Sequence, residues 1–144
     1  ILYSAHSLSR LSNASGAELL AMHRNPWWLT ARGATLDAGA YVVGLEFATG
    51  RPARTLGKPS PVVFRQAVDG LNADLGARLP RRAFAMVGDD PKADVAAAQR
   101  VGLRGILVLS GKTSAAEAQA LGATGRRGPD AVAATLGDVV AALD

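Results

Sequence analysis

The run AFAMVGDDPKADVAAAQRVG, residues 83–102, passes from a strand-like segment through an acidic turn into a helix. The apolar segment Ala83–Val87 has the length of a buried strand and stops at Gly88. Pro91 suits the first position of a helix, and Gly102 suits its end. One apolar stripe runs along this helix: Val95, Ala98 and Val101. A strand followed at once by an amphipathic helix is typical of βαβ units.

The same alternation continues on both sides of this run. Apart from it, the pattern predicts strands at 53–56, 106–109 and 130–134, and helices at 59–71, 114–121 and 136–143. Ser114 and Glu117 have the spacing of a helix capping box. Strands and helices that alternate in this way predict an α/β fold with a parallel sheet.

The first fifty residues are organised differently. We expect a strand at Glu18–His23, a loop at Asn25–Asp37 and a helix at Gly39–Thr49, whereas Ser4–Ser15 is polar and weakly patterned. The change of pattern near Arg54 indicates a junction between two architectures, because no low-complexity linker separates them.

The composition and charge of the chain exclude several kinds of functional site and partner. The chain has 144 residues, 49% of them hydrophobic, and no cysteine, which excludes disulfides, thiolate nucleophiles and zinc–thiolate sites. Its net charge of +4 comes from scattered basic residues, and only 5% of residues are aromatic, so we expect no nucleic-acid binding. No apolar run approaches the roughly 20 residues that cross a bilayer. We therefore expect a soluble, cytoplasmic protein without membrane association.

Polar residues follow three predicted strands at the points where the strands end: Gly57-Lys58-Pro59, the run 88–94 and Ser110-Gly111-Lys112. The carboxyl ends of parallel strands meet at one edge of the sheet, where ligands bind. Asp89 suits direct ligation of Mg²⁺, Asp94 could orient Lys58 or a metal-bound water, and Lys58 could neutralise a phosphoryl group. Alternatively, Asp89 and Asp90 simply cap the helix that begins at Pro91.

Two other classes of phosphate-handling protein match this sequence less well. Residues 108–114 mimic the end of a nucleotide-binding P-loop, but Ile106 stands where that motif requires glycine, which leaves Lys112 as a surface-loop residue. In a phosphoacceptor receiver domain the acidic residues precede the lysine, whereas here Lys58 comes first.

Three segments together resemble the third and fourth motifs of haloacid dehalogenase (HAD) phosphatases: LGKPSP at 56–61, MVGDDPKADV at 86–95 and GLRGILVLSGK at 102–112. More narrowly, they are similar to subfamily IIA, which includes phosphoglycolate and p-nitrophenyl phosphatases with a large α/β cap domain. The upstream run GAELLAMHRN at 16–25, with residues 39–41 and 45–50, resembles the end of that cap domain. The resemblance covers residues 16–144.

This resemblance implies a Rossmann-like parallel sheet, with residues 54–144 as the C-terminal half of the core and 1–53 as the C-terminal part of the cap domain. It also implies Mg²⁺ and a phospho-aspartyl intermediate. By motif matching, Lys58 contacts phosphate and Asp94 supports it as the second catalytic residue, while Asp89 is the metal ligand. We expect Asn25 and Trp27, in the cap domain, to contact substrate.

The chain departs from the family in one respect. The family's nucleophile and general acid form an Asp-x-Asp motif, and Asp37 has no second aspartate two residues on. We therefore expect the first half of the core to be absent and this chain alone to be inactive. The expected partners are a small phosphorylated metabolite and a second copy bound through the cap domain. The alternative is a non-catalytic binding or scaffold protein that retains part of the phosphatase fold.

Overall fold

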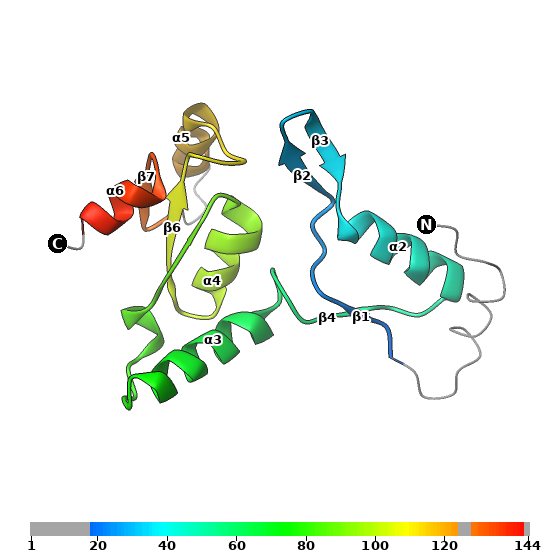
Figure 1. Ribbon diagram of the computed structural model, residues 1–144, viewed down its shortest axis with the longest axis horizontal. Helices are drawn as coiled ribbons and strands as arrows, with labels where there is room; N and C mark the ends of the chain where they lie inside the picture. Colours follow the sequence, from blue (N-terminus) through cyan, green and yellow to red (C-terminus); the bar gives the residue numbers. More distant parts are fainter. Residues whose placement is uncertain (1–17, 124–127, 143–144) are drawn as a thin grey trace. The chain divides into compact units, whose positions relative to one another are not determined.

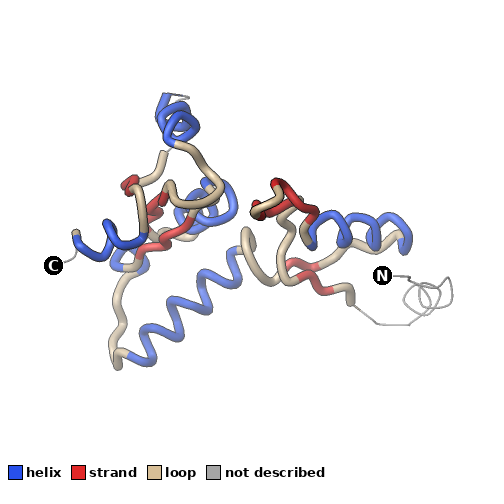
Figure 2. Tube along the Cα trace, turned by 45° about the horizontal axis from the view of Figure 1, so that its top comes forward, coloured by secondary structure: helices blue, strands red, loops and turns tan. Residues whose placement is uncertain are grey.

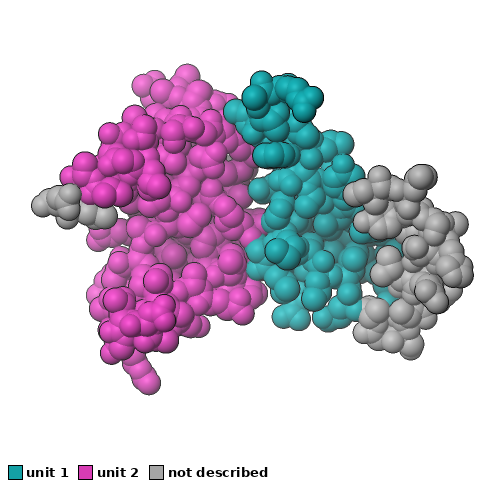
Figure 3. Space-filling model, viewed as in Figure 1, with its two compact units in different colours: residues 1–57 teal, residues 58–144 magenta. Residues whose placement is uncertain are grey.

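The computed structural model describes residues 18–123 and 128–142. The chain divides into two compact units, residues 1–57 and 58–144, which Figure 3 colours separately. The expectations for Ser4–Ser15 lie outside the described residues.

The second unit alternates helices and strands, as Figures 1 and 2 show. Its elements are α3 (Pro61–Asp74), η1 (Arg81–Ala83), β5 (Ala85–Gly88), η2 (Pro91–Ala96), α4 (Ala97–Arg100), β6 (Arg104–Val108), α5 (Ala115–Ala123), β7 (Ala131–Ala133) and α6 (Leu136–Ala141). Strands β5, β6 and β7 form one sheet in that order, and both pairs are parallel. The predicted α/β fold with a parallel sheet is confirmed.

Two boundaries around β5 differ from the prediction. The strand begins at Ala85 because a 3-10 turn precedes it, in which Ala83 N donates to Pro80 O at 2.8 Å. After Pro91 the chain first forms the π-helix η2, in which Val95 N donates to Asp90 O at 3.3 Å, and only then the α-helix α4. Such π-helical turns often lie at functional sites.

The core of the second unit lies between α3, α4 and the sheet. Phe64 and Val68 of α3 are each 4% exposed and pack among the small side chains Ala97 and Ala98 of α4. Leu107 of β6 is fully buried. The apolar stripes that the sequence predicts on the two helices therefore face each other.

The first unit contains β1 (Leu20–Ala21), β2 (Trp27–Thr30), β3 (Gly33–Leu36), α2 (Ala38–Thr49) and β4 (Arg54–Thr55). The prediction of a loop at 25–37 is wrong, because β2 and β3 pair as an antiparallel hairpin. Gly33, at φ 101°, closes its two-residue turn, and Thr30 Oγ1 donates to Gly33 O at 2.9 Å. No Asn-Gly or Asp-Gly pair marks this turn in the sequence.

The short strand predicted at 53–56 also pairs differently from expectation. It forms as β4, but it pairs in parallel with β1 of the first unit and takes no part in the sheet of β5, β6 and β7. Arg54 N donates to Leu19 O at 2.8 Å, and Leu56 N to Ala21 O at 2.9 Å.

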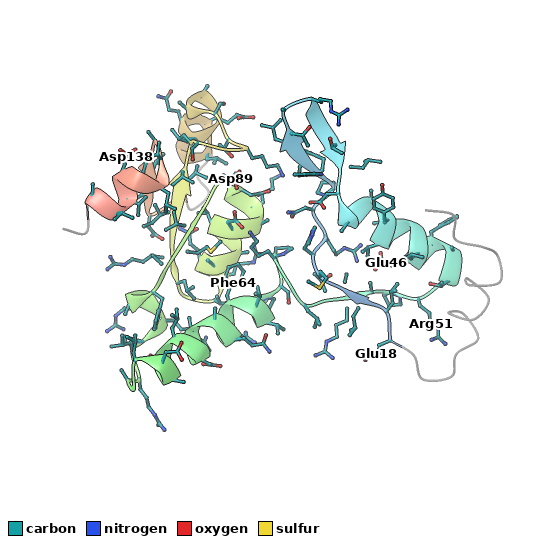
Figure 4. All side chains as sticks on the ribbon, viewed as in Figure 1. Glu18, Glu46, Arg51, Phe64, Asp89 and Asp138 are labelled. Carbon is teal, nitrogen blue, oxygen red and sulfur yellow. The ribbon has the colours of Figure 1, made fainter. Side chains whose placement is uncertain are left out.

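One ion pair connects three segments of the first unit. Arg24 reaches Glu46 of α2 through two hydrogen bonds of 2.6 and 2.8 Å, and Ala53 N donates to the same carboxylate at 2.7 Å. Figure 4 labels Glu46 on α2. The Arg24 hydrogen bonds first, and the Ala53 amide second, lower the pKa of Glu46 from 4.5 to about 2.

Within the described residues, none of the helices combines the length and the apolar character that a bilayer crossing requires.

The buried face of α3 predicts unequal costs for two substitutions on one helix. Phe64→Ala should lower the free energy of unfolding by about 3–5 kcal/mol, because it removes a buried ring and leaves a cavity. Leu71→Ala, at a side chain that is 48% exposed, should cost only roughly 1 kcal/mol. Urea unfolding followed by circular dichroism measures both. Equal losses would contradict this assignment of the core.

The Glu46 pKa predicts how stability depends on pH. Because the folded-state pKa is depressed, the pair contributes its full stability above pH 4.5, and this contribution is lost as the pH falls towards 2. The difference in unfolding free energy between wild type and Glu46→Gln should therefore shrink over that range. Glu18→Gln is the control, since Glu18 is exposed and lies 3.9 Å from Arg54. A difference that stays constant with pH would show that Glu46 is not held in this pair.

Candidate functional site

The site lies in the second unit, where the loops after β5 and β6 meet. Parallel pairing sets Gly88, the last residue of β5, opposite Leu107 of β6, so both strands end at the same edge of the sheet. The segment after β5 carries three carboxylates: Asp89 and Asp90 in the loop, and Asp94 in the first turn of η2. Figure 4 labels Asp89 at the start of this loop.

Lys58 and Asp94 form an ion pair. Lys58 Nζ lies 2.7 Å from Asp94 Oδ1, with the lysine side chain 42% exposed and the aspartate side chain only 4% exposed. The contact lacks the geometry of a directed hydrogen bond, and Asp94 Oδ1 has no hydrogen-bond partner among the described residues. The buried carboxylate therefore orients an ammonium group that still reaches solvent, where an anionic ligand could meet it.

Asp94 is held from two sides. It belongs to η2, and its Oδ2 accepts a hydrogen bond from Asp90 N at 3.3 Å. Gly88 allows this arrangement, because a Cβ at that position would lie 2.6 Å from the Cβ and Cγ of Asp94. A larger residue at 88 would push the carboxylate away from Lys58.

Asp90 is the N-cap of η2. Its Oδ1 accepts from Lys92 N and Ala93 N, each at 2.9 Å, and its Oδ2 accepts from Lys112 Nζ at 2.8 Å. Burial acts to raise the pKa of Asp90, but the hydrogen bonds from Ala93, Lys112 and Lys92 outweigh it and hold the pKa below its ordinary value. At neutral pH the Asp90 carboxylate is therefore ionised, and its oxygens accept hydrogen bonds that hold the turn together.

Asp89 has different partners. Its Oδ2 accepts from the backbone N of Lys112 at 2.8 Å, and its carbonyl oxygen accepts from Thr113 Oγ1 at 2.8 Å. Neither bond is a helix cap. Of the two acids that could cap the helix after Pro91, Asp90 alone does so, which leaves Asp89 for another task.

The Asp89 carboxylate could supply one part of the coordination shell of a Mg²⁺ ion. Mg²⁺ typically takes one or two protein carboxylates and completes its shell with water and phosphate oxygens. Asp89 supplies one such carboxylate at the end of a strand. In the part of the chain that the structure describes, no three or more His, Asp or Glu side chains gather into a metal-binding group. The remaining ligands would therefore be water, phosphate or groups beyond the described residues.

In the second unit Lys58 contacts Asp94, and Asp94 accepts a hydrogen bond from Asp90, the neighbour of Asp89 in the sequence. Asn25 and Trp27 belong to the first unit. Asn25 O accepts from Gly39 N at 2.9 Å, and Trp27 lies opposite Leu36 in the hairpin. Substrate contact by these two residues stays a prediction.

Sequence reasoning missed the role of two residues. The interpretation of Lys112 as a surface-loop residue is wrong, because its side chain is 21% exposed and pairs with Asp90. Thr113, which is 5% exposed, carried no distinguishing pattern. The available signal was position: both residues follow a predicted strand at the same edge as Asp89.

Comparison with known proteins points to one family. Residues 55–139 match the HAD-hydrolase-like family model. Haloacid dehalogenase-like hydrolase domain-containing protein 2 of Bos taurus is 38% identical over 102 residues, which are 71% of this chain and 37% of that protein. The chain thus spans little more than a third of this relative's length.

Two solved phosphatase structures share the fold. The p-nitrophenyl phosphatase from Archaeoglobus fulgidus superposes with a TM-score of 0.76 at 29% identity, covering 97% of this chain and 52% of that one. The glycerol phosphate phosphatase from Mycobacterium tuberculosis, solved in complex with magnesium, gives a TM-score of 0.68 at 30% identity. This match covers 90% of the present chain and 37% of the phosphatase chain. Since the family model matches residues 55–139, more than half of this chain, the chain belongs to the HAD-hydrolase-like family.

Proposed function

We propose that the protein carrying this chain is a Mg²⁺-dependent phosphohydrolase that acts on phosphate monoesters through a phospho-aspartyl intermediate. The observation that carries this proposal is the ion pair between Lys58 and Asp94, 2.7 Å long. It lies in the same unit as Asp89, and Asp94 accepts a hydrogen bond from Asp90, the residue next to Asp89. Family membership supports hydrolase chemistry, and the similar solved structures are phosphatases.

Each residue has a defined task in this proposal. Lys58 offsets negative charge on the transferring phosphoryl group, and the buried Asp94 carboxylate fixes the position of its ammonium. Asp89 would hold Mg²⁺, which when bound supplies further positive charge at the phosphate. Asp90 keeps the turn closed by capping η2. Charge stabilisation and positioning of this kind account for most of the catalysis of phosphoryl transfer.

The nucleophile is the part that this chain does not supply. The 144 residues contain no Asp-x-Asp motif. We place the attacking aspartate in a part of the protein outside these residues. Its carboxylate would attack phosphorus as the ester oxygen leaves, and water would then hydrolyse the acyl phosphate.

The remaining assignments belong to the same proposal. Residues 54–144 form the C-terminal half of the core domain, and residues 1–53 the end of a cap domain in which Asn25 and Trp27 contact substrate. The substrate is a small phosphorylated metabolite, the protein acts in the cytoplasm and pairs with a second copy through the cap domain, and it binds neither nucleic acid nor membrane. The named activities of the similar phosphatases support the substrate class.

Substitution of the two charged groups tests the proposal. In the complete protein, Asp89→Asn and Lys58→Ala should each lower Mg²⁺-dependent hydrolysis of p-nitrophenyl phosphate by about 10²–10³-fold, because each removes a charge that stabilises the transition state. Lys92→Ala is the matched control, since Lys92 lies in η2 between Asp90 and Asp94 and its side chain is exposed. It should retain activity within about 2-fold, the change expected away from the chemistry.

Circular dichroism must show that all three variants are folded. Wild-type rates in either Asp89→Asn or Lys58→Ala would defeat the assignment. A folded wild-type protein that hydrolyses no phosphate ester with Mg²⁺ present would favour the non-catalytic scaffold instead.

A further inference from the structure

Among the described residues, three hydrogen bonds join the segment after β6 to the acid pair after β5. Lys112 contributes two, from its backbone N to Asp89 Oδ2 and from its Nζ to Asp90 Oδ2, each 2.8 Å long. Thr113 contributes the third, from Oγ1 to the carbonyl oxygen of Asp89, also 2.8 Å long. One dipeptide therefore holds the main chain of Asp89, one oxygen of its carboxylate and the side chain of its neighbour.

These contacts are shielded from water. Thr113 is 5% exposed, and the Lys112 and Asp90 side chains are 21% and 16% exposed. A buried hydroxyl that loses its acceptor, or a carbonyl that loses its donor, is destabilised because water cannot replace the missing partner. The Thr113 hydroxyl therefore constrains the Asp89 backbone more strongly than an exposed hydrogen bond would.

Gly111 shows how closely the two loops approach. A Cβ at this position would lie 2.8 Å from both the Cβ and the Cγ of Asp89, and closer still to its Oδ2. Only a residue without a side chain allows the Lys112 amide to reach the carboxylate. The loop after β6 therefore lies directly against Asp89.

A carboxylate fixed in this way differs from a free one. One oxygen of Asp89 accepts a hydrogen bond from a main-chain amide, and the carbonyl of the same residue is bound by Thr113. Both the side chain and the backbone are therefore oriented before any ligand arrives. Ligand groups that are oriented by neighbouring hydrogen bonds bind metals more tightly, and loss of such a neighbour typically costs about 10–100-fold in metal affinity.

We propose that Thr113 and Lys112 are positioning residues that set the affinity of the Asp89 carboxylate for a divalent cation. This inference rests on the proposed function, which assigns Asp89 as the ligand of Mg²⁺. Neither residue touches the cation. Thr113 acts through the Asp89 main chain, and Lys112 acts through Asp90 and through its own backbone amide.

Direct titration of the complete protein with MgCl₂, without substrate and followed by calorimetry, tests this inference. Thr113→Val keeps the shape but removes the hydroxyl, and it should raise the Kd for Mg²⁺ about 10-fold or more. Thr113→Ser restores the hydroxyl and should return the Kd to within about 3-fold of wild type. Lys112→Met should weaken binding and Lys112→Arg should largely restore it, since arginine keeps the charge opposite Asp90.

Ser114→Ala is the structural control. Ser114 is the next residue of the same loop, but its hydroxyl bonds Glu117 at 2.7 Å in the capping box of α5 and not Asp89. Ser114→Ala should lower the melting temperature and leave the Kd for Mg²⁺ unchanged. A merely structural role for Thr113 would give the same result in Thr113→Val.

The outcomes separate this inference from the proposed function. If Asp89→Asn abolishes Mg²⁺ binding while folded Thr113→Val and Lys112→Met bind like wild type, the positioning role is wrong and the phosphatase proposal stands. If Asp89→Asn binds Mg²⁺ like wild type, Asp89 is not the ligand and both proposals are wrong. Should Thr113→Val fail to fold, Lys112→Met decides, because its substitution leaves the Thr113 hydrogen bond in place.

Discussion

The parallel pairing of β5 with β6 is the constraint on which the site depends. It sets Gly88 opposite Leu107 and so ends both strands at one edge of the sheet. The loop with the carboxylates and the loop with Lys112 then face each other although they are more than twenty residues apart in sequence. In an antiparallel pair the two loops would lie at opposite ends of the strands.

Three carboxylates within six residues perform three different tasks because their surroundings differ. The Asp90 carboxylate caps η2 and accepts a hydrogen bond from Lys112, whereas Asp94 is buried beside the Lys58 ammonium. Asp89 is held through one oxygen by a main-chain amide and takes no part in the cap. The capping function and the proposed metal function, which compete for the same acids in the sequence, are thus divided between neighbours.

Hydrogen bonds to charged side chains organise the first unit as well. Glu46 joins the segment after β1, helix α2 and the segment before β4 through Arg24 and the Ala53 amide. These hydrogen bonds tie the segment that follows β1 to the segment that precedes β4, both within this unit. The contacts flank the short parallel pair of β1 and β4, in which only two residues of each strand take part.

The sequence by itself determined the α/β class and the position of the core helices, because hydrophobic period is a local property. It also predicted Lys58, Asp89 and Asp94 as site residues, through strand-end chemistry and the resemblance to the family. The Ser114–Glu117 capping box was equally readable, since its partners lie within one helical turn. Local patterns do not specify which strands pair, so only the tertiary structure decided that β4 joins β1 and that Asn25–Asp37 contains a hairpin. The partners of Lys112 and Thr113 were likewise settled by strand pairing, which brings groups distant in sequence within hydrogen-bond reach.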